Sequence, residues 1–135
     1  MDCIFCDIIQ RKSPAEIIYE DEKVISFLDI RPINYGHTLV IPKKHYDDFI
    51  SVPPDEMKAV INITQTISEA VSISLKTDGF NIIANNGAAA GQKVFHFHFH
   101  IIPRYNTDKF HFRPILKNYK NGSMKEIADK NTSFI

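Results

Sequence analysis

Cysteine is scarce in this 135-residue sequence, which contains only Cys3 and Cys6. Two cysteines this close together are too few for the disulfide framework of a small secreted domain, so we expect a reducing compartment, the cytoplasm. The first residues, MDCIFCD, have neither a basic region nor a long apolar stretch and do not resemble a secretory signal.

Long apolar runs and an excess of charge are also missing. No stretch is long and apolar enough for a membrane-spanning helix, and the last residues, NTSFI, contain no lipidation motif. The 16 lysine and arginine residues balance 16 aspartate and glutamate residues, which gives a net charge of +0 with histidine neutral. Without a basic surface the chain is not drawn to nucleic acid or membranes, so any phosphate that it binds must be held at a local site.

Hydrophobic periodicity predicts a mixed α+β domain. Apolar residues at helical spacing, Ile4, Phe5, Ile8 and Ile9, predict a short N-terminal helix that ends near Ser13-Pro14. One long helix is predicted from Pro54 to a stop at Asp78-Gly79. The apolar face of the long helix is expected to comprise Met57, Val60, Ile61, Ile67, Val71 and Leu75. Residues 105–135 are polar and weakly periodic, and we expect them to form a tail that follows the surface.

Short β-branched or aromatic runs, separated by turn residues, predict about five strands that form an antiparallel sheet. The expected strands are Ile17–Tyr19, Val24–Leu28, Thr38–Ile41, Phe80–Ala84 and Val94–Ile102.

Histidine is the residue type that stands out, because three of the six histidines lie between His96 and His100. The segment His96–Ile102 reads HFHFHII, and a strand with this alternation places the histidines on one face and the apolar residues on the other. Residues two apart on a strand are separated by about 6.6 Å, close enough to share one substrate or metal ion. Three interpretations remain open: a solvated strand face, a three-histidine metal site that activates water, and an imidazole nucleophile that attacks phosphorus.

A glycine-bearing loop, Asn85–Gln92, leads into the histidine segment. Backbone N–H groups of such a loop can converge on an anion, although a plain turn is as compatible with the sequence. Together with the aligned histidines, the loop favours a phosphate site.

The HFHFHII segment resembles the signature of the histidine triad (HIT) family of nucleotide hydrolases and transferases. Four other segments resemble family blocks in the family's order: Cys3–Ile9, Phe27–Ile30, Gly36–His45 and Gly91-Gln92. The resemblance covers about residues 3–104 and leaves residues 105–135 unmatched. It implies one domain over residues 1–135, a HIT-like antiparallel sheet of about five strands with one long and one short N-terminal helix, and a homodimer.

In the family, the middle histidine attacks the α-phosphorus of a nucleotide and forms a nucleotidyl-histidine that water then hydrolyses. The resemblance therefore implies that His98 is the nucleophile and that His100 and His37 attend the phosphate. It implies a purine nucleotide substrate, with hydrolysis of nucleoside phosphoramidates as the first expectation. Hydrolysis of dinucleoside polyphosphates is the alternative, and a non-catalytic nucleotide-binding module is another.

The resemblance also implies the residues that hold the nucleotide. The phosphate and leaving-group contacts are Asn85, Gly91 and Gln92, the ribose-binding acid is Asp29, and the base pocket comprises Phe5, Ile8, Phe27 and Ile30. Each of these four apolar residues, taken alone, can equally be plain core. Lys93 departs from the family pattern, because a small hydroxyl residue is frequent at this position, and this leaves open how the leaving group is protonated or held.

The pair Cys3-x-x-Cys6 can be a redox dithiol or half of a tetrahedral zinc site. The βαβ context of a thioredoxin-like motif is missing around it. In the cysteine-bearing branch of the HIT family the other two ligands resemble His45 and His96. The resemblance therefore implies a structural Zn²⁺ bound by Cys3, Cys6, His45 and His96, and it leaves His111 as a surface histidine.

Overall fold

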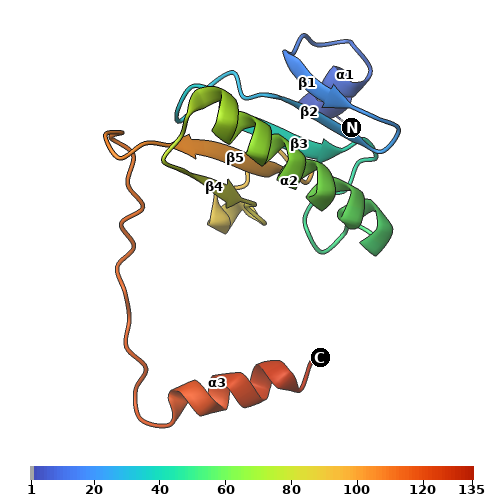
Figure 1. Ribbon diagram of the computed structural model, residues 1–135. Helices are drawn as coiled ribbons and strands as arrows, with labels where there is room; N and C mark the ends of the chain where they lie inside the picture. The colour runs from blue at the N-terminus through green and yellow to red at the C-terminus, as the bar shows by residue number, and fades with distance from the viewer. Residues whose placement is uncertain (1) are drawn as a thin grey trace.

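The structure is a computed structural model that describes residues 2–135 (Figure 1). It has the expected α+β fold, with a five-stranded antiparallel sheet in the order β1-β2-β3-β5-β4. The strands are β1 (Ile17–Glu20), β2 (Val24–Leu28), β3 (Thr38–Pro42), β4 (Gly79–Ile83) and β5 (Phe99–Arg104). The helices are α1 (Ile4–Ile9), α2 (Pro54–Leu75) and α3 (Ser123–Thr132). Helix α1 ends before the predicted stop at Ser13-Pro14, because Arg11 has a φ of +62°, which a helix cannot contain. Within the described part of the chain, no helix is long and apolar enough to cross a membrane.

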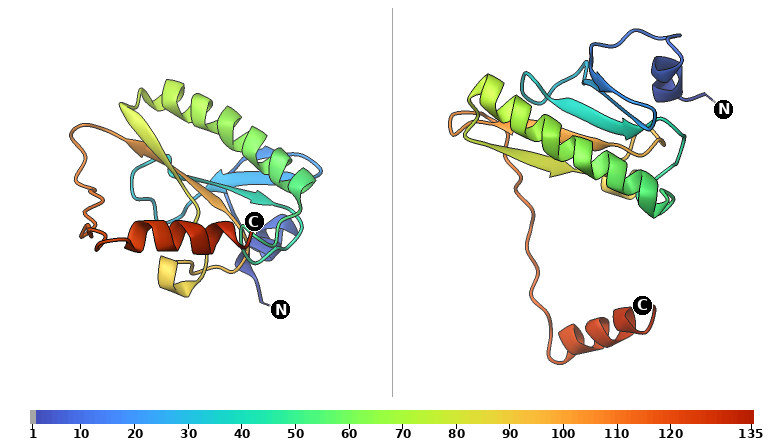
Figure 2. Two further views of the ribbon diagram at one scale, coloured as in Figure 1. Left: turned by 90° about the horizontal axis from the view of Figure 1, so that it is seen from below. Right: turned by 45° about the vertical axis from the view of Figure 1, so that its right-hand side comes forward.

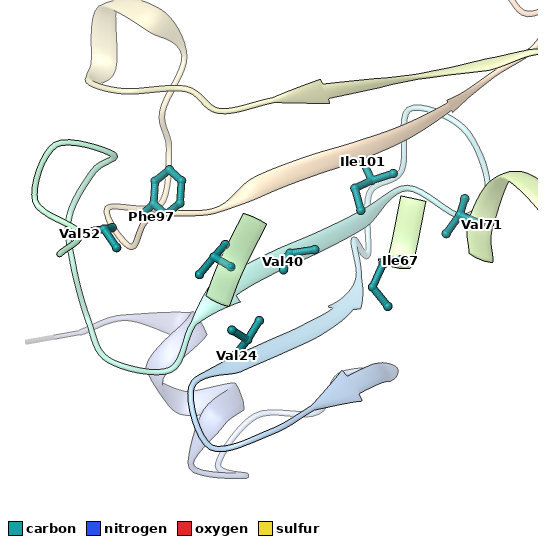
Figure 3. Packing of buried hydrophobic residues seen from close by; sticks show 8 residues of the cluster. Val24, Val40, Val52, Ile67, Val71, Phe97 and Ile101 are labelled. Carbon is teal, nitrogen blue, oxygen red and sulfur yellow. The ribbon is translucent and has the colours of Figure 1, made fainter. Parts of the chain in front are cut away.

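The central strands are buried on both faces because different helices cover them. Val24 and Val40 pack with Ile67 of α2, as Figure 3 shows. Ile25 and Ile41, one position further along the same strands, pack with α1 on the opposite face. Strands buried on both faces read as continuous apolar runs, which explains the lack of alternation in β2 and β3.

The long helix differs from its predicted apolar face at two positions. Ile61 is 48% exposed and Leu75 is 38% exposed. Leu75 covers Gly36, where a Cβ atom would overlap the Leu75 Cδ1 atom. Gly36 also has a φ of +92°, a backbone conformation that glycine adopts without strain, so the residue before His37 must be small and conformationally free.

The strand predicted over Val94–Ile102 is wrong at its start, because β5 begins only at Phe99. The preceding residues bond to the end of β3 and the loop that follows it, outside the sheet. Phe97 donates its N–H to the Tyr46 carbonyl, and the His96 ring bonds to the Pro42 carbonyl. The alternation nevertheless persists, since Phe97 and Ile101 pack with α2 whereas His98 and His100 face the α1 side.

The surface-following tail is a second prediction that the structure contradicts. Residues 111–122 extend away from the sheet, and α3 lies apart from the rest of the molecule (Figures 1 and 2). Every residue from 111 to 135 is exposed except Ser123, which is half-buried. Polar composition alone indicated exposure correctly, but it could not indicate the direction in which the chain leaves the sheet.

Candidate active site

A cleft of about 690 Å³ lies between α1, the end of β2 and the histidine segment. Ten of the eleven predicted catalytic and nucleotide-binding residues line it: Phe5, Ile8, Phe27, Asp29, Ile30, His37, Asn85, Gly91, His98 and His100. The structure therefore brings together residues that are up to 95 positions apart in the sequence.

The tautomer of His98 follows from its hydrogen bond. Its Nδ1 atom lies 2.7 Å from the His96 carbonyl oxygen, and because a carbonyl only accepts, Nδ1 must carry the proton. The neutral ring then has its lone pair on Nε2, for which the described residues provide no partner. Burial lowers the pKa of His98, despite the opposing effect of the His96 carbonyl, so the ring is neutral and Nε2 is available as a nucleophile.

The tautomer of His100 is fixed through His37. The backbone N–H of Ile33 donates to His37 Nδ1 at 3.1 Å, so the proton of His37 is on Nε2. His37 Nε2 in turn donates to His100 Nδ1 at 2.9 Å, which places the proton of His100 on its Nε2. Burial lowers the pKa of His37 and that of His100, the latter to about 4, so both rings are neutral. The cleft thus combines a lone pair on His98 with an N–H donor on His100.

The conformation of the loop at residues 85–92 depends on Gly91 and Gln92. Gly91 has a φ of +91°, a backbone conformation that other residues adopt only with strain, although an added Cβ atom would have room beside Asn85. The side chain of Gln92 is only 4% exposed and does not line the cleft. Its amide nitrogen donates to the Asp47 carbonyl at 2.6 Å and its amide oxygen accepts from Gly87 N–H at 2.8 Å. The structure therefore places Gln92 where it holds the loop, and its side chain does not face a ligand in the cleft.

The other end of the cleft is apolar with one acid. Phe5 and Phe27 are buried and meet edge to face at 5.4 Å, while Ile30 is 88% exposed at the rim. Asp29 accepts the N–H of Arg31 at 2.9 Å, and its second oxygen lies 3.7 Å from His37 Nε2. Sequence reasoning missed Arg31, which lines the cleft next to the predicted acid. Its position directly after Ile30, the last residue of the Phe27–Ile30 block, was the available signal.

Cys3, Cys6, His45 and His96 form a second cluster, whose ligand atoms all lie within 4.8 Å of one another. The sulfur-to-Nδ1 distances are 3.5 Å for Cys3 and His96, 3.6 Å for Cys6 and His96, and 3.3 Å for Cys6 and His45. Tetrahedral zinc with ordinary bond lengths separates a thiolate and an imidazole ligand by about 3.6 Å. The four side chains therefore fit a zinc ion.

Neighbouring groups fix the tautomers of the two histidines in this cluster. His96 Nε2 donates to the Pro42 carbonyl at 2.7 Å, and His45 Nε2 donates to the Asp47 carboxylate at 2.9 Å. Both rings are thereby left with a lone pair on Nδ1, the atom that faces the cysteines. Asp47, two residues after His45, was missed by sequence reasoning. Burial and the neighbouring Cys3 thiol raise the pKa of Cys6 to about 11, which disfavours a reactive redox dithiol.

The geometry argues against a metal ion at two other groups of residues, namely the three histidines His96, His98 and His100, and the group of Asp29, His37 and His100. Among residues 2–135, no metal-ligand cluster contains His96, His98 and His100 together. The cluster of Asp29, His37 and His100 is compact, but the N–H of Ile33 occupies His37 Nδ1 and forces the proton onto the nitrogen that would bind the ion. That cluster suits hydrogen bonding better than metal binding.

The fold and the site together define an α+β protein with a histidine-lined cleft beside a Cys₂His₂ cluster. Residues 10–107 match the HIT domain, and the chain belongs to the HIT family. It is 53% identical over 108 residues to an uncharacterised HIT-like protein of Methanocaldococcus jannaschii. That match covers 78% of this chain and 81% of the relative. It is 45% identical to adenylylsulfatase HINT3 of Arabidopsis thaliana over 79% of this chain and 54% of the relative.

Two solved structures show the same fold. A HIT family protein from Bacillus subtilis superposes with a TM-score of 0.91 at 37% identity. The superposition covers 100% of this chain and 98% of the Bacillus subtilis chain. A Zn-bound histidine triad family protein from Mycobacterium smegmatis has a TM-score of 0.78 at 41% identity and covers 98% of both chains.

The link from His37 to His100 predicts a graded response to substitution. His37→Leu removes the donor that fixes the His100 tautomer, and we expect kcat to fall roughly 10- to 100-fold with little change in KM. His37→Gln retains an N–H donor and should preserve most of kcat. Steady-state kinetics of the two variants checks this, and equal losses in both would contradict the proposed link.

The lowered pKa of His100 predicts acid-sensitive stability. The folded pKa is about 4, whereas histidine in an unfolded chain titrates at about 6.5. Between these values the unfolded state binds more protons, so this contribution to stability is complete above pH 6.5 and is lost as the pH falls towards 4. We expect the Tm drop from pH 7 to pH 5 to be smaller in His100→Gln, by roughly 3 °C. Thermal unfolding at both pH values tests this, and equal drops would argue against it.

Proposed function

We propose that the protein is a hydrolase that acts at the α-phosphate of purine nucleoside monophosphate derivatives through a nucleotidyl-His98 intermediate. The observation that carries the proposal is the pair of fixed tautomers, with the free lone pair of His98 and the N–H donor of His100 in one cleft. The neighbouring apolar pocket and Asp29 suit a base and a ribose, and the relative named adenylylsulfatase supports an adenylyl substrate.

The chemistry proceeds in two displacements. In the first, His98 Nε2 forms a bond to phosphorus as the bond to the leaving group breaks, and the leaving group keeps the electron pair and takes a proton from water, so that a phosphoramidate releases ammonia or an amine. The His98 ring then carries a positive charge, which the His96 carbonyl stabilises through Nδ1–H. His100 Nε2–H donates to a phosphate oxygen. In the second step, water oxygen bonds to phosphorus, the bond to His98 breaks, and a water proton passes to solvent as the nucleoside monophosphate forms.

Nucleoside phosphoramidates such as adenosine 5′-phosphoramidate are the proposed substrates, and dinucleoside polyphosphates are the alternative. Lys93 speaks for the alternative, because its positive charge suits the additional phosphates of a dinucleoside polyphosphate. The residue is exposed, lines the cleft and forms no ion pair with any carboxylate in residues 2–135. An assay of both substrate classes at equal concentration tests the proposal. We expect release of the nucleoside monophosphate, with the higher kcat/KM for the phosphoramidate. Tight nucleotide binding without turnover of either class would instead indicate a non-catalytic module.

We propose that a structural Zn²⁺ is bound by Cys3, Cys6, His45 and His96. All four positions of a tetrahedral ion are then filled by protein, so the ion holds α1 and its Cys3 cap against the segment that carries His98. In this position the ion would have a structural role, and other residues line the neighbouring cleft. The Zn-bound relative supports this proposal, and ligation by thiolates suits the cytoplasm, where cysteines stay reduced.

We also propose a homodimer. The edge strand β4 exposes Phe80 and Ile82, and a groove of about 900 Å³ separates it from the exposed side of α2. The groove is lined mainly by apolar and small polar residues, including Ile61, Ile73 and Phe99. An uncovered apolar edge strand favours pairing with another chain, and a second copy can pair symmetrically.

A further inference from the structure

The loop of residues 29–37, between β2 and β3, carries groups that matter at both ends of the cleft. It starts at Asp29 and ends at His37, and it contains Ile33, whose N–H fixes the tautomer of His37. None of its residues belongs to a helix or a strand. The position of the Ile33 N–H therefore depends on the contacts that hold this loop from outside.

Asn34 makes those contacts. Its side-chain amide donates to the Pro103 carbonyl at 2.7 Å and to the Asp108 carboxylate at 3.0 Å, so both N–H bonds of the amide are used. Within residues 2–135, these two are the only hydrogen bonds that join residues 30–36 to parts of the chain outside residues 29–38. One side chain thus connects the loop that carries His37 to β5, the strand that carries His100.

Asp108 is itself held in place for this contact. Arg104 donates to both of its oxygens, from Nε at 2.9 Å and from Nη2 at 3.0 Å, and the Tyr105 N–H donates to it at 2.9 Å. The side chain of Asp108 is 7% exposed, and the hydrogen bonds from Arg104 hold its pKa well below the usual range, so it stays ionised. Arg104 also donates to the Asn81 side chain on β4 at 2.8 Å. Asn34, Asp108 and Arg104 therefore form a chain of hydrogen bonds that ends in the sheet, here called the loop anchor.

The loop anchor lies outside the cleft, because none of its three residues lines it. Any effect of the anchor on a reaction in the cleft must therefore pass through other residues. The ion pair of Arg104 and Asp108 is complete without Asn34, since Arg104 already meets both carboxylate oxygens. The additional bond to Asn34 directs this pair towards the loop, at the residue next to Ile33.

Loss of the loop anchor would change where two histidines carry their protons. The tautomer of a neutral imidazole is set by the hydrogen bonds of its two nitrogens, so without the Ile33 donor the His37 proton is free to move to Nδ1. His37 would then present a lone pair to His100 Nδ1, which would have to carry the proton. His100 would lose the Nε2–H that faces the cleft.

We propose that Asn34 and Asp108 are positioning residues, and that the loop anchor holds the Ile33 N–H against His37 and so preserves the N–H donor of His100. Arg104 orients Asp108 for this purpose. The inference rests on the proposed function for its kinetic readout and deepens it, because it adds residues outside the cleft to the machinery of the same site.

Substitution of Asn34 tests the loop anchor by kinetics. Asn34→Asp keeps the shape of the side chain but donates no hydrogen bond, and we expect kcat to fall roughly tenfold with little change in KM. Asp108→Asn keeps an oxygen that accepts from Asn34, so it should retain most of kcat. Tyr35→Ala, in the same loop with a residue that is 89% exposed, is the control and should keep wild-type kcat. A wild-type kcat in Asn34→Asp would overturn the proposal.

A double-mutant cycle shows whether the loop anchor acts through His37. In His37→Leu there is no tautomer left to fix, so the addition of Asn34→Asp should lower kcat by no more than about twofold further. A merely structural anchor would lower kcat by the same factor in both backgrounds, and that result would count against the proposed role.

Ring spectra of ¹⁵N-labelled protein report the tautomer without any substrate. Two-bond ¹H–¹⁵N correlations distinguish protonated from unprotonated ring nitrogens, and we expect the His37 proton on Nε2 in the wild type and on both nitrogens in Asn34→Asp. An unchanged tautomer in this variant would refute the proposal. Asn34→Ser, whose hydroxyl supplies one donor in place of two, gives the same reading if Asn34→Asp does not fold. A wild-type chain that turns over no nucleotide would refute the proposed function, and the ring spectra would then decide on the loop anchor alone.

Discussion

His98→Ala should abolish the proposed hydrolysis of nucleotides. The substitution removes the atom that forms the bond to phosphorus in the proposed reaction, and loss of a catalytic nucleophile lowers kcat by a factor on the order of 10⁴ or more. Because His98 packs against the Phe5 ring at 5.1 Å, a smaller side chain also loosens the base end of the cleft. Steady-state kinetics with the preferred substrate measures the loss.

Two controls separate chemistry from folding in this experiment. His98→Asn keeps a polar side chain in the cleft but offers no nucleophilic nitrogen, so its kcat should fall as far as that of the alanine variant. His111→Ala, in the exposed C-terminal segment of residues 111–135, removes a histidine outside the cleft and should leave kcat unchanged. A His98→Ala enzyme that retains wild-type kcat and a native Tm would sink the nucleophile assignment.

Loss of one zinc ligand should produce the largest change in stability. Cys6→Ala leaves three ligands and an open position, and metal binding at such sites contributes directly to folding. We expect a loss of about 3 kcal/mol and a Tm lower by roughly 10 °C. Thermal unfolding, together with elemental analysis that shows about one zinc ion per wild-type chain and less in the variant, measures both effects.

The matched control for this prediction is Asp7→Ala. Asp7 lies on the same short helix as Cys6 but does not belong to the four-residue cluster, so its variant should keep its zinc. Under conditions where Cys6→Ala remains folded, kcat should stay within a few-fold of wild type, because the nucleophile is elsewhere. A large fall in kcat with an unchanged Tm would indicate that the ion takes part in the reaction.

Periodicity predicted much of the sheet, and the resemblance to the HIT family predicted most of the residues that line the cleft. Alternation from His96 to Ile102 separated the faces correctly, although hydrogen bonds from this segment to Pro42 and Tyr46 delay the start of β5. Those bonds join segments about 50 residues apart, and no local pattern reports them. The tautomers of His98 and His100 were equally hidden, because they depend on the backbone of His96 and Ile33.

The C-terminal segment, residues 111–135, shows a different limit of sequence reasoning. Composition indicated correctly that the segment is exposed, but it could not indicate that the chain leaves the sheet instead of following its surface. Gln92 shows the same limit on a smaller scale. The family resemblance implied a contact in the cleft, but the Gln92 amide is engaged by the Asp47 and Val94 carbonyls and by the N–H of Gly87.

The covalent intermediate provides the most direct test of the account. Adenosine 5′-phosphoramidate is mixed with a stoichiometric amount of enzyme and quenched within one turnover in alkaline denaturant, and the peptides are sequenced by mass spectrometry. The account predicts one adenylyl group on His98 and none on His96 or His100, with no adduct in His98→Ala. Turnover without any adduct on His98, or an adduct on His100 instead, would contradict it.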